Sequence, residues 1–277
     1  MKKLSYLVLS LGILLSCGKS GKEPTPNPNP TTRGPVITVM TYNIYGARSG
    51  GVPDDDLKAI AKTITDNKAD LVALNEVDAF TTRNGKDRHL ARDLAALTGM
   101  NWYFTKAMDF YGGEYGDAVL SKFPILESKR YSLPVADGVG GELRSVAMIK
   151  VKKDDKEFYF AATHLDHLQI EDNRILQANQ LKQIVADLNK PLILAGDFNA
   201  KPDSQTMTIV KGYMTLGCRQ QCPFTYPSGG GSYGTPANTI DYIMYSPVDK
   251  FAINSYNAIP YLSASDHAPV VATIELK

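Results

Sequence analysis

The sequence lacks the features of several functional classes. Its 277 residues carry a formal net charge of +1, with 30 Lys and Arg against 29 Asp and Glu and no cluster of Lys and Arg. This balance argues against a protein that binds nucleic acid nonspecifically through a basic face. The chain shows no repeat, and no apolar run approaches the roughly 20 residues that span a bilayer. Because α/β sandwiches often reach this length as one unit, we expect one folded domain.

The N-terminus has the pattern of an export signal. Two lysines precede an apolar stretch over residues 4–15, and Ser-Cys follows, ending at Cys17. The pattern predicts a signal peptide over residues 1–16. The Leu-Leu-Ser-Cys sequence resembles the bacterial lipoprotein signal, in which the cysteine becomes the lipidated first residue after cleavage. The alternative is an ordinary secretory signal with an incidental cysteine.

The segment that follows is too polar and proline-rich to fold. Residues 17–34 consist mainly of Gly, Lys, Pro, Thr and Asn, so they cannot bury apolar area and predict a flexible tether behind a lipidated Cys17. The folded, catalytic domain is expected over residues 35–277. Loss of the two N-terminal lysines with the signal leaves acidic residues slightly in excess.

Only two further cysteines are present, Cys218 and Cys222. In an exported protein such a pair can form a local disulfide, and two free thiols are the alternative. A zinc site would need two more ligands nearby, and the sequence has none at metal-site spacing.

The apolar pattern predicts a mixture of strands and helices. Helical crossovers alternate with hairpin-like neighbours, which predicts two mixed sheets packed face to face with helices outside. The segment 173–189 is expected to bury one apolar face that includes Leu176, Leu181 and Ile184. The predicted strands cover residues 36–40, 71–74, 102–106, 118–120, 146–151, 158–163, 192–195, 239–245, 251–258 and 269–276; the predicted helices cover 57–64, 89–98, 173–189 and 204–210.

Polar residues stand directly beside these strands. Because neighbouring strands can end at one rim of a sheet, residues far apart in sequence can share one site. The residues so placed are Asn43, Glu76, His164, Asp197, Asn199, Asp266 and His267.

Six motifs around these residues resemble those of the endonuclease/exonuclease/phosphatase family, and they occur in that family's order. They are TYNIY at 41–45, LNEVD at 74–78, THLDH at 163–167, GDFNA at 196–200, IDYI at 240–243 and SDHAPV at 265–270. The resemblance implies a four-layer α/β/β/α sandwich, in which helices flank two packed mixed β-sheets. It also implies a metal-dependent phosphoric ester hydrolase.

Phosphate-ester hydrolysis requires neutralised phosphoryl oxygens and a water aimed in line. Glu76 offers the carboxylate oxygen that Mg²⁺ prefers, with Asn43 as a neutral partner and Asp266 holding a metal-bound water or a second ion. Mg²⁺, or Mn²⁺, is therefore the expected cofactor, because the site lacks a zinc-type His/Cys set. The plainer alternatives are a surface carboxylate for Glu76 and a turn residue for Asn43.

The remaining motif residues have distinct expected roles. Asp197 polarises the attacking water and Asn199 orients it or donates to a phosphate oxygen, unless the pair only forms an Asx turn. Asp241 fixes the tautomer of His267, whose imidazolium donates to the developing phosphorane. By the resemblance, His164 stabilises charge from the opposite side.

Four other residues are less clearly assigned. Arg144 is predicted to contact phosphate through its guanidinium, with a surface ion pair as the alternative. His167 is a candidate substrate contact, whereas His89 is expected to be structural. Asp117 stands where relatives commonly carry asparagine, and an extra negative charge puts phosphate contact there in doubt.

The sequence therefore predicts an exported, membrane-tethered, Mg²⁺-dependent phosphoesterase in the cell envelope, facing the periplasm or the cell surface. Its substrate is expected to be a lipid, nucleotide or nucleic acid ester, and a lipid or small molecule is preferred because the charge is near neutral. The alternative is a noncatalytic envelope protein that binds a phosphorylated or glycan ligand.

Overall fold

The computed structural model describes residues 33–48, 53–227, 235–259 and 264–277. Residues 33–277 form one compact unit. The predicted signal peptide, Cys17 and all but the end of the predicted tether lie outside the described residues, as does most of the Gly/Ser-rich stretch around 227–236.

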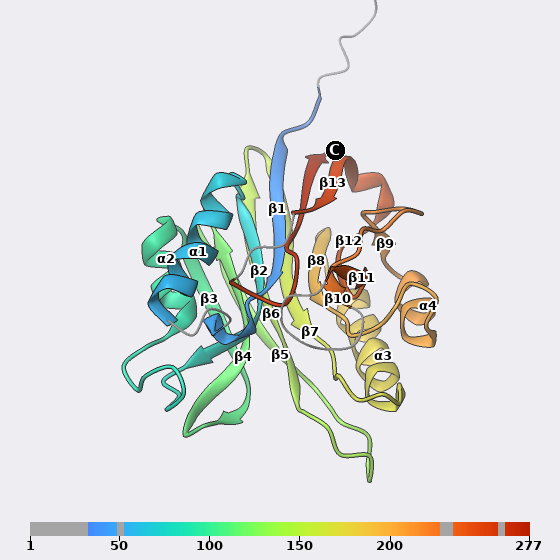
Figure 1. The fold of residues 1–277 in the computed structure, drawn as a ribbon. Coiled ribbons are helices and arrows are strands. Elements are labelled where there is room, and N and C mark those ends of the chain that lie inside the picture. Colours follow the sequence, from blue (N-terminus) through green and yellow to red (C-terminus); the bar gives the residue numbers. More distant parts are fainter. Residues whose placement is uncertain (1–32, 49–52, 228–234, 260–263) are drawn as a thin grey trace, which may run out of the picture. The chain divides into compact units, whose positions relative to one another are not determined.

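Two six-stranded mixed sheets make up the centre of the fold (Figure 1). Within each sheet one pair of neighbours is parallel, β1 with β2 and β7 with β8, and the other pairs are antiparallel. The first sheet has the order β13 (Phe251–Ala258), β14 (Val270–Leu276), β1 (Val36–Asn43), β2 (Leu71–Ala79), β4 (Gly113–Ser121) and β3 (Asn101–Phe110). The second has the order β5 (Glu127–Leu133), β6 (Arg144–Lys153), β7 (Lys156–His164), β8 (Leu192–Asp197), β12 (Asp241–Ser246) and β9 (Thr215–Leu216).

In the described residues, four α-helices cover the outer faces of the sheets (Figure 1). Helices α1 (Pro53–Asp66) and α2 (Leu90–Thr98) pack on the first sheet, and α3 (Asp172–Ala186) and α4 (Gln205–Lys211) pack on the second. His89 is the N-cap of α2, and its side chain accepts a hydrogen bond from Arg92 N. Gly99 is the C-cap and adopts the left-handed conformation. The predicted α/β/β/α sandwich is confirmed. None of the helices in the described residues is long and apolar enough to cross a membrane.

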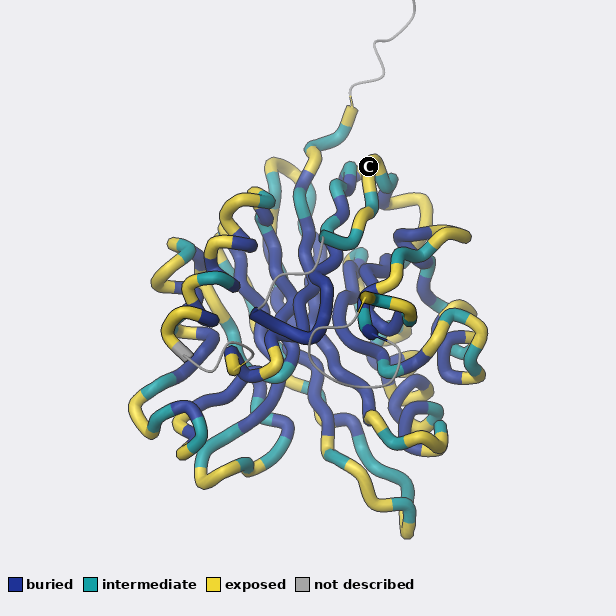
Figure 2. Tube along the Cα trace, viewed as in Figure 1, coloured by how far each residue is buried: buried dark blue, intermediate teal, exposed yellow. Residues whose placement is uncertain are grey.

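Apolar side chains fill three layers between these elements. The central strands are accordingly buried along most of their length, and exposed residues gather in the peripheral loops and helices (Figure 2). The layer between the sheets includes Ile37, Phe158 and Phe160, all about 1 % exposed or less. The outer two layers lie between each sheet and its helices. Both sheets are thus buried on two faces, which explains why the central strands are continuous apolar runs.

Two local features differ from the sequence expectation. Strand β5 was not predicted, because its residues alternate between exposed polar and half-buried positions at a sheet edge. Helix α3 buries Leu181 and Ile184 as expected, but Leu176 is 38 % exposed. Its buried face is completed by polar residues, of which Asn173 donates to Gly140 O and accepts from Ala136 N.

Short elements complete the described chain: η1 (Tyr45–Ala47), η2 (Val248–Lys250) and the small sheet of β10 (Tyr226–Pro227) and β11 (Pro236–Asn238).

Candidate active site

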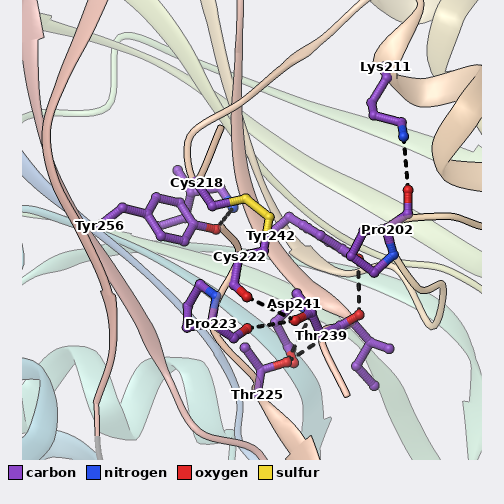
Figure 3. The surroundings of a disulfide bond; sticks show 12 residues. Pro202, Lys211, Cys218, Cys222, Pro223, Thr225, Thr239, Asp241, Tyr242 and Tyr256 are labelled. Atoms are coloured by element: carbon purple, nitrogen blue, oxygen red, sulfur yellow. Dashed lines mark hydrogen bonds between the residues drawn. A yellow bond between two sulfur atoms is a disulfide. The ribbon is translucent and has the colours of Figure 1, made fainter. Parts of the chain in front are cut away.

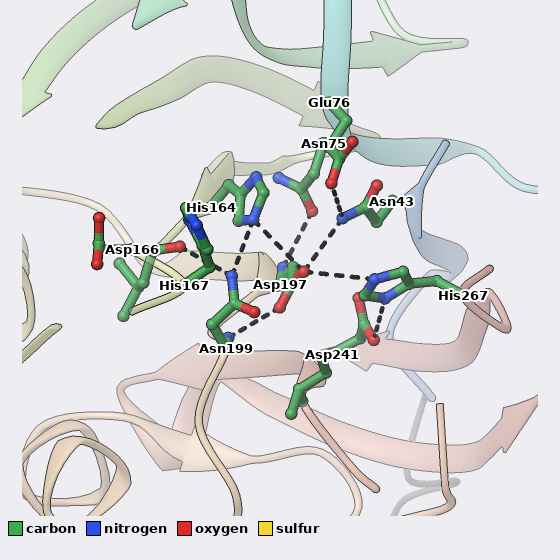
Figure 4. Close-up of polar contacts among 12 residues, drawn as sticks. Asn43, Asn75, Glu76, His164, Asp166, His167, Asp197, Asn199, Asp241 and His267 are labelled. Atoms are coloured by element: carbon green, nitrogen blue, oxygen red, sulfur yellow. Dashed lines mark hydrogen bonds and ion pairs between the residues drawn. The ribbon is translucent and has the colours of Figure 1, made fainter. Parts of the chain in front are cut away.

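A pocket of about 460 Å³ lies where the two sheets end together. The register of the parallel pairs explains this convergence: Asn43, the last residue of β1, pairs with Asn75 at the bulge of β2, and His164 pairs with Asp197 at the ends of β7 and β8. Most of the predicted site residues line the pocket, namely Glu76, Arg144, His164, His167, Asp197, Asn199, Asp266 and His267. Asn43 and Asp241 lie just behind them and are bonded to lining residues (Figure 4).

Strained backbone turns two of these side chains into the pocket. Glu76 lies in a bulge of β2 and has a φ of 59°, and Asn199 has a φ of 47°. Non-glycine residues adopt this region rarely and at a cost, so its occurrence at two site residues supports a functional constraint.

Asn43 connects two carboxylates. Its Nδ2 lies 3.1 Å from Glu76 Oε1 and 3.1 Å from Asp197 Oδ2, while its Oδ1 accepts from Tyr45 N. The side chain is fully buried. It therefore fixes the positions of Glu76 and Asp197 relative to each other.

Asp197 lies at the centre of the polar cluster (Figure 4). Its Oδ1 accepts from Asn199 N at 2.8 Å, and its backbone N donates to Asn75 Oδ1 at 3.0 Å. Burial, reinforced by the charge of Asp241, raises the pKa of Asp197 to about 7 against the opposing effect of His267. A carboxylate of this pKa can accept a proton near neutral pH.

His267 and Asp241 form a buried hydrogen-bonded pair. The Nδ1 of His267 lies 2.9 Å from Asp241 Oδ2, and its Nε2 lies 3.7 Å from Asp197 Oδ2. Burial alone would lower the pKa of His267, but Asp241 and Asp197 outweigh it and raise the pKa to about 10. The ring is therefore an imidazolium at neutral pH.

His164 differs from His267 in its charge. Arg144 Nη1, which can only donate, lies 3.0 Å from His164 Nδ1. Burial and the Arg144 charge lower the pKa of His164 well below its usual value. The neutral ring carries one proton, and both of its nitrogens face donors: Arg144 Nη1 lies at Nδ1, and Asn199 Nδ2, which also donates to Leu165 O, lies 3.0 Å from Nε2. Nε2 also lies 3.5 Å from Asp197 Oδ2.

Arg144 is buried and is not part of a surface ion pair, which was the alternative to a phosphate contact. Its side chain is 2 % exposed and lines the pocket, with Nη2 2.8 Å from Glu142 Oε2 and 3.3 Å from His167 Nδ1. The His167 side chain is 54 % exposed at the pocket mouth. His89 lies away from the pocket among Phe80, Trp102 and Phe104, as its expected structural role requires.

Sequence reasoning missed the residue that joins the two sheets beneath the site. Asn75 donates to Asp117 Oδ1 at 2.7 Å and to Thr163 O at 2.9 Å, and it accepts from Asp197 N. Asp117 is 1 % exposed and does not line the pocket, which agrees with the doubt about phosphate contact there. The only sequence signal was the position of Asn75 inside the LNEVD motif.

The pocket wall also contains residues outside the motifs. Arg83 is held by Asp78 through two bonds of 2.6 and 2.8 Å and stacks on Phe110 at 4.5 Å. Tyr226 packs against His267 with ring centroids 4.6 Å apart. Arg83 lies in a turn, Phe110 at the end of β3 and Tyr226 in the short strand β10, and no periodic signal in the sequence links them, so only the fold brings them here.

The oxygen atoms present suit a hard divalent cation. Glu76 and Asp266 both line the pocket, and Asp266 Oδ1 is buried without a hydrogen-bond partner among the described residues. A buried carboxylate oxygen is normally satisfied, so this one fits a metal or a metal-bound water. Ligand atoms of Asp197, Asp241 and His267 also lie within 4.8 Å of one another. There, however, His267 Nδ1 is already bonded to Asp241 Oδ2 at 2.9 Å, so of the two ring nitrogens Nε2 is the one left for a metal.

Comparisons with known proteins agree with this geometry. The endonuclease/exonuclease/phosphatase family model matches residues 40–267. No curated protein matches the sequence. Similar solved structures include a family member from Bacteroides thetaiotaomicron, with 20 % identity, a TM-score of 0.70 and coverage of 88 % of this chain and 99 % of that one.

Two further structures have more specific names. A mannosyl-6-phosphatase from Bacteroides thetaiotaomicron is 22 % identical, with a TM-score of 0.66 and coverage of 86 % of this chain and 99 % of that one. The human nocturnin catalytic domain with bound sulfate is 21 % identical, with a TM-score of 0.67 and coverage of 89 % and 95 %. At these identities the likeness shows the fold alone. Because the family match spans most of the sequence, the chain belongs to the endonuclease/exonuclease/phosphatase family and, as predicted, is a metal-dependent phosphoester hydrolase.

Proposed function

We propose that this protein is an exported, membrane-tethered, Mg²⁺-dependent phosphoesterase that hydrolyses small phosphate esters by in-line attack of water. The observation that carries the chemical part is the pairing of Asp197, a carboxylate with a pKa of about 7, with the charged His267 across one pocket. The export and tethering part rests on the N-terminal sequence.

Glu76 and Asp266 hold the cation, and the oxygen of Asn43 has one lone pair that Tyr45 N does not use. When bound, Mg²⁺ neutralises charge on the phosphoryl oxygens. Asn43 Nδ2 keeps the Glu76 carboxylate in place. Mn²⁺ prefers the same ligands and is expected to substitute.

Asp197 Oδ2 accepts a proton from the attacking water, and Asn199, whose backbone N donates to Asp197 Oδ1, holds this carboxylate in place. His267 donates from Nε2 to a phosphoryl oxygen as charge develops there, while Asp241 holds Nδ1. His164 lines the other side of the pocket as a neutral ring, and it donates to the substrate when its proton is on Nε2. Burying a neutral His164 beside Arg144 costs less free energy than burying a second imidazolium there would.

Charge balance favours a small substrate over a polyanion. Each guanidinium in the pocket is matched by a carboxylate, Arg83 by Asp78 and Arg144 by Glu142. Of the described residues lining the pocket, none is a lysine. A nucleic acid strand needs surplus positive charge along its backbone, whereas one phosphate group can be bound by the cation and the imidazolium. The name of the mannosyl-6-phosphatase neighbour indicates a substrate of this size.

The test is turnover by the purified mature protein on a panel of sugar phosphates, nucleotides, inositol phosphates, sphingomyelin, DNA and RNA, with Mg²⁺ and with EDTA. We expect metal-dependent release of phosphate from one small-molecule class, with kcat/KM at least about tenfold above that for DNA. Fastest turnover of DNA would overturn the substrate proposal. Binding of a panel member without any turnover would favour the noncatalytic alternative.

A further inference from the structure

Thr225 is bonded to the backbone of Asp241 (Figure 3) and to that of Ala268, next to His267, although it carries none of the proposed chemistry. It is fully buried and follows the Cys218–Cys222 disulfide by three residues. No apolar or motif pattern in the sequence distinguishes it.

Its contacts connect the backbones of both partners. Thr225 Oγ1 accepts from Asp241 N at 3.3 Å and from the preceding Ile240 N at 3.2 Å. Its backbone O accepts from Ala268 N, directly after His267, at 2.8 Å. A single residue is therefore bonded to the segment that carries the acid and to the segment that carries the imidazole.

The next residue restricts the imidazole itself. Tyr226 lies with its ring centroid 4.6 Å from that of His267, at an interplanar angle of 43°. Asp241 holds one ring nitrogen of His267 at 2.9 Å. The ring is thus held by a hydrogen bond at Nδ1 and by a tilted aromatic ring packed against it.

The segment that carries Thr225 and Tyr226 is itself anchored. Cys218 and Cys222 are joined in a disulfide, and Thr239 Oγ1 donates to Pro223 O at 2.8 Å. On the other side, Thr225 N donates to Asn238 O at 2.7 Å. Figure 3 shows how the disulfide, Thr239 and Asp241 surround this short stretch.

We propose that Thr225 and Tyr226 are positioning residues that hold Asp241 and His267 in their reactive arrangement. Outer hydrogen bonds and packing of this kind commonly set the geometry of catalytic groups. The inference rests on the proposed function for its kinetic readout, but the arrangement itself is measurable without turnover.

The first test compares Thr225→Val with Thr225→Ser in the mature protein, using the best substrate of the panel with Mg²⁺. Valine keeps the shape but leaves two buried N–H groups without an acceptor, so kcat should fall at least about tenfold with KM within about twofold. Serine restores the acceptor and should keep kcat within about threefold. Thr63→Val is the matched control, because Thr63 is buried and its hydroxyl bonds Ala59 O in α1, away from the pocket. It should lower the melting temperature without lowering kcat.

The second test asks whether the effect passes through His267. In a His267→Ala background, Thr225→Val should lower kcat by less than about twofold, because the positioned group is gone. Tyr226→Ala should lower kcat at unchanged KM, and Tyr226→Phe, which keeps the ring against His267, should rescue most of that loss. A raised KM at unchanged kcat, or an undiminished loss in the His267→Ala background, would overturn the positioning role.

Amide hydrogen exchange separates this inference from the proposed function. Thr225→Val should speed exchange at Ile240 and Asp241 at least about tenfold, and Thr63→Val should not. If no substrate is turned over, the proposed function fails while exchange still decides the positioning role. Unchanged exchange in Thr225→Val would refute it.

Discussion

Asp197 and His267 show how one buried pocket produces two opposite ionisation states. Burial raises the pKa of the carboxyl to about 7, and the neighbouring carboxylates raise that of the imidazole to about 10. Near neutral pH this gives a carboxylate that can accept a proton beside a cation that can stabilise negative charge. Environments that separate two titratable groups in this way assign the acid and base roles of an active site.

The first prediction concerns this pair. His267→Ala and Asp241→Asn should each lower kcat at least about a hundredfold with little change in KM, because the lost interaction forms mainly at the transition state. The double variant should be hardly worse than His267→Ala, since Asp241 acts through the ring. Adding His164→Ala should cause a further loss. The test is to measure kcat and KM of all variants, with thermal melts and the remote variant His89→Asn as controls. If the losses in kcat of His267→Ala and Asp241→Asn multiply as independent effects, the assigned roles are wrong.

The second prediction uses Asp117, whose pKa burial raises to about 7 against the hydrogen bonds from Asn75 and Ser145. Between pH 4 and pH 7 the unfolded chain loses this proton first, so stability falls as pH rises through that window. Asp117→Asn has no proton to lose and therefore removes this loss of stability. Its new amide group can donate to Ser145 Oγ, because the Ser145 hydroxyl can donate to Thr105 O instead. The variant should melt a few degrees above wild type at pH 8 and close to it at pH 4, measured in EDTA. An equal difference at both pH values would refute the titration argument.

At the scale of elements, the sequence predicted what depends on apolar periodicity. The central strands and the ends of α2 follow the pattern, because buried strands need apolar runs and helix ends need caps. Edge strand β5 was missed because half of its residues face solvent. Asn75 and Thr225 were missed for a different reason: their partners lie on other strands, and no local pattern encodes such contacts. The positions of the motif residues could be predicted, but not the network that holds them.

The third prediction concerns the β7–β8 pair, where Gly196 lies opposite Thr163 just before Asp197. A Cβ at Gly196 would lie 1.8 Å from Thr163 O, a backbone atom that cannot move without parting the strands. Gly196→Ala should therefore lower the free energy of unfolding by more than about 3 kcal/mol, or prevent folding. Gly212→Ala, with 3.1 Å to its nearest atom, is the control and should stay near wild type in urea denaturation. A normal urea midpoint for Gly196→Ala would contradict the close approach.

For the whole molecule, the site links the two halves of the sandwich. Asn43 and Glu76 come from the first sheet, whereas Asp197 comes from the second, and their carboxylates meet at Asn43 Nδ2. The cation that Glu76 and Asp266 are expected to hold lies beside this link, and it should stabilise the fold because only the folded chain brings its ligands together.

The fourth prediction follows from that link. EDTA should stop turnover, Mg²⁺ should restore it, and millimolar Mg²⁺ should raise the melting temperature by binding only the folded state. Glu76→Gln should abolish both responses. In EDTA this variant should melt no lower than wild type, because burial, with the charge of Asp266, raises the pKa of Glu76, and the neutral amide removes this unfavourable charge. Full activity after exhaustive chelation would remove the metal mechanism.

The last prediction concerns Cys17, whose expected lipidation would attach the whole enzyme to a membrane. Every predicted catalytic, metal and substrate residue lies in the compact unit of residues 33–277, so the fold does not depend on the anchor. Cys17→Ser should therefore abolish palmitate incorporation and move the protein out of the membrane fraction, while kcat and the melting temperature of the purified protein stay at wild-type values. Fractionation and radiolabelled palmitate would measure this. A wild-type protein that is soluble and unlabelled would instead support the ordinary secretory signal, and a variant that stays in the membrane fraction unlabelled would require another means of attachment.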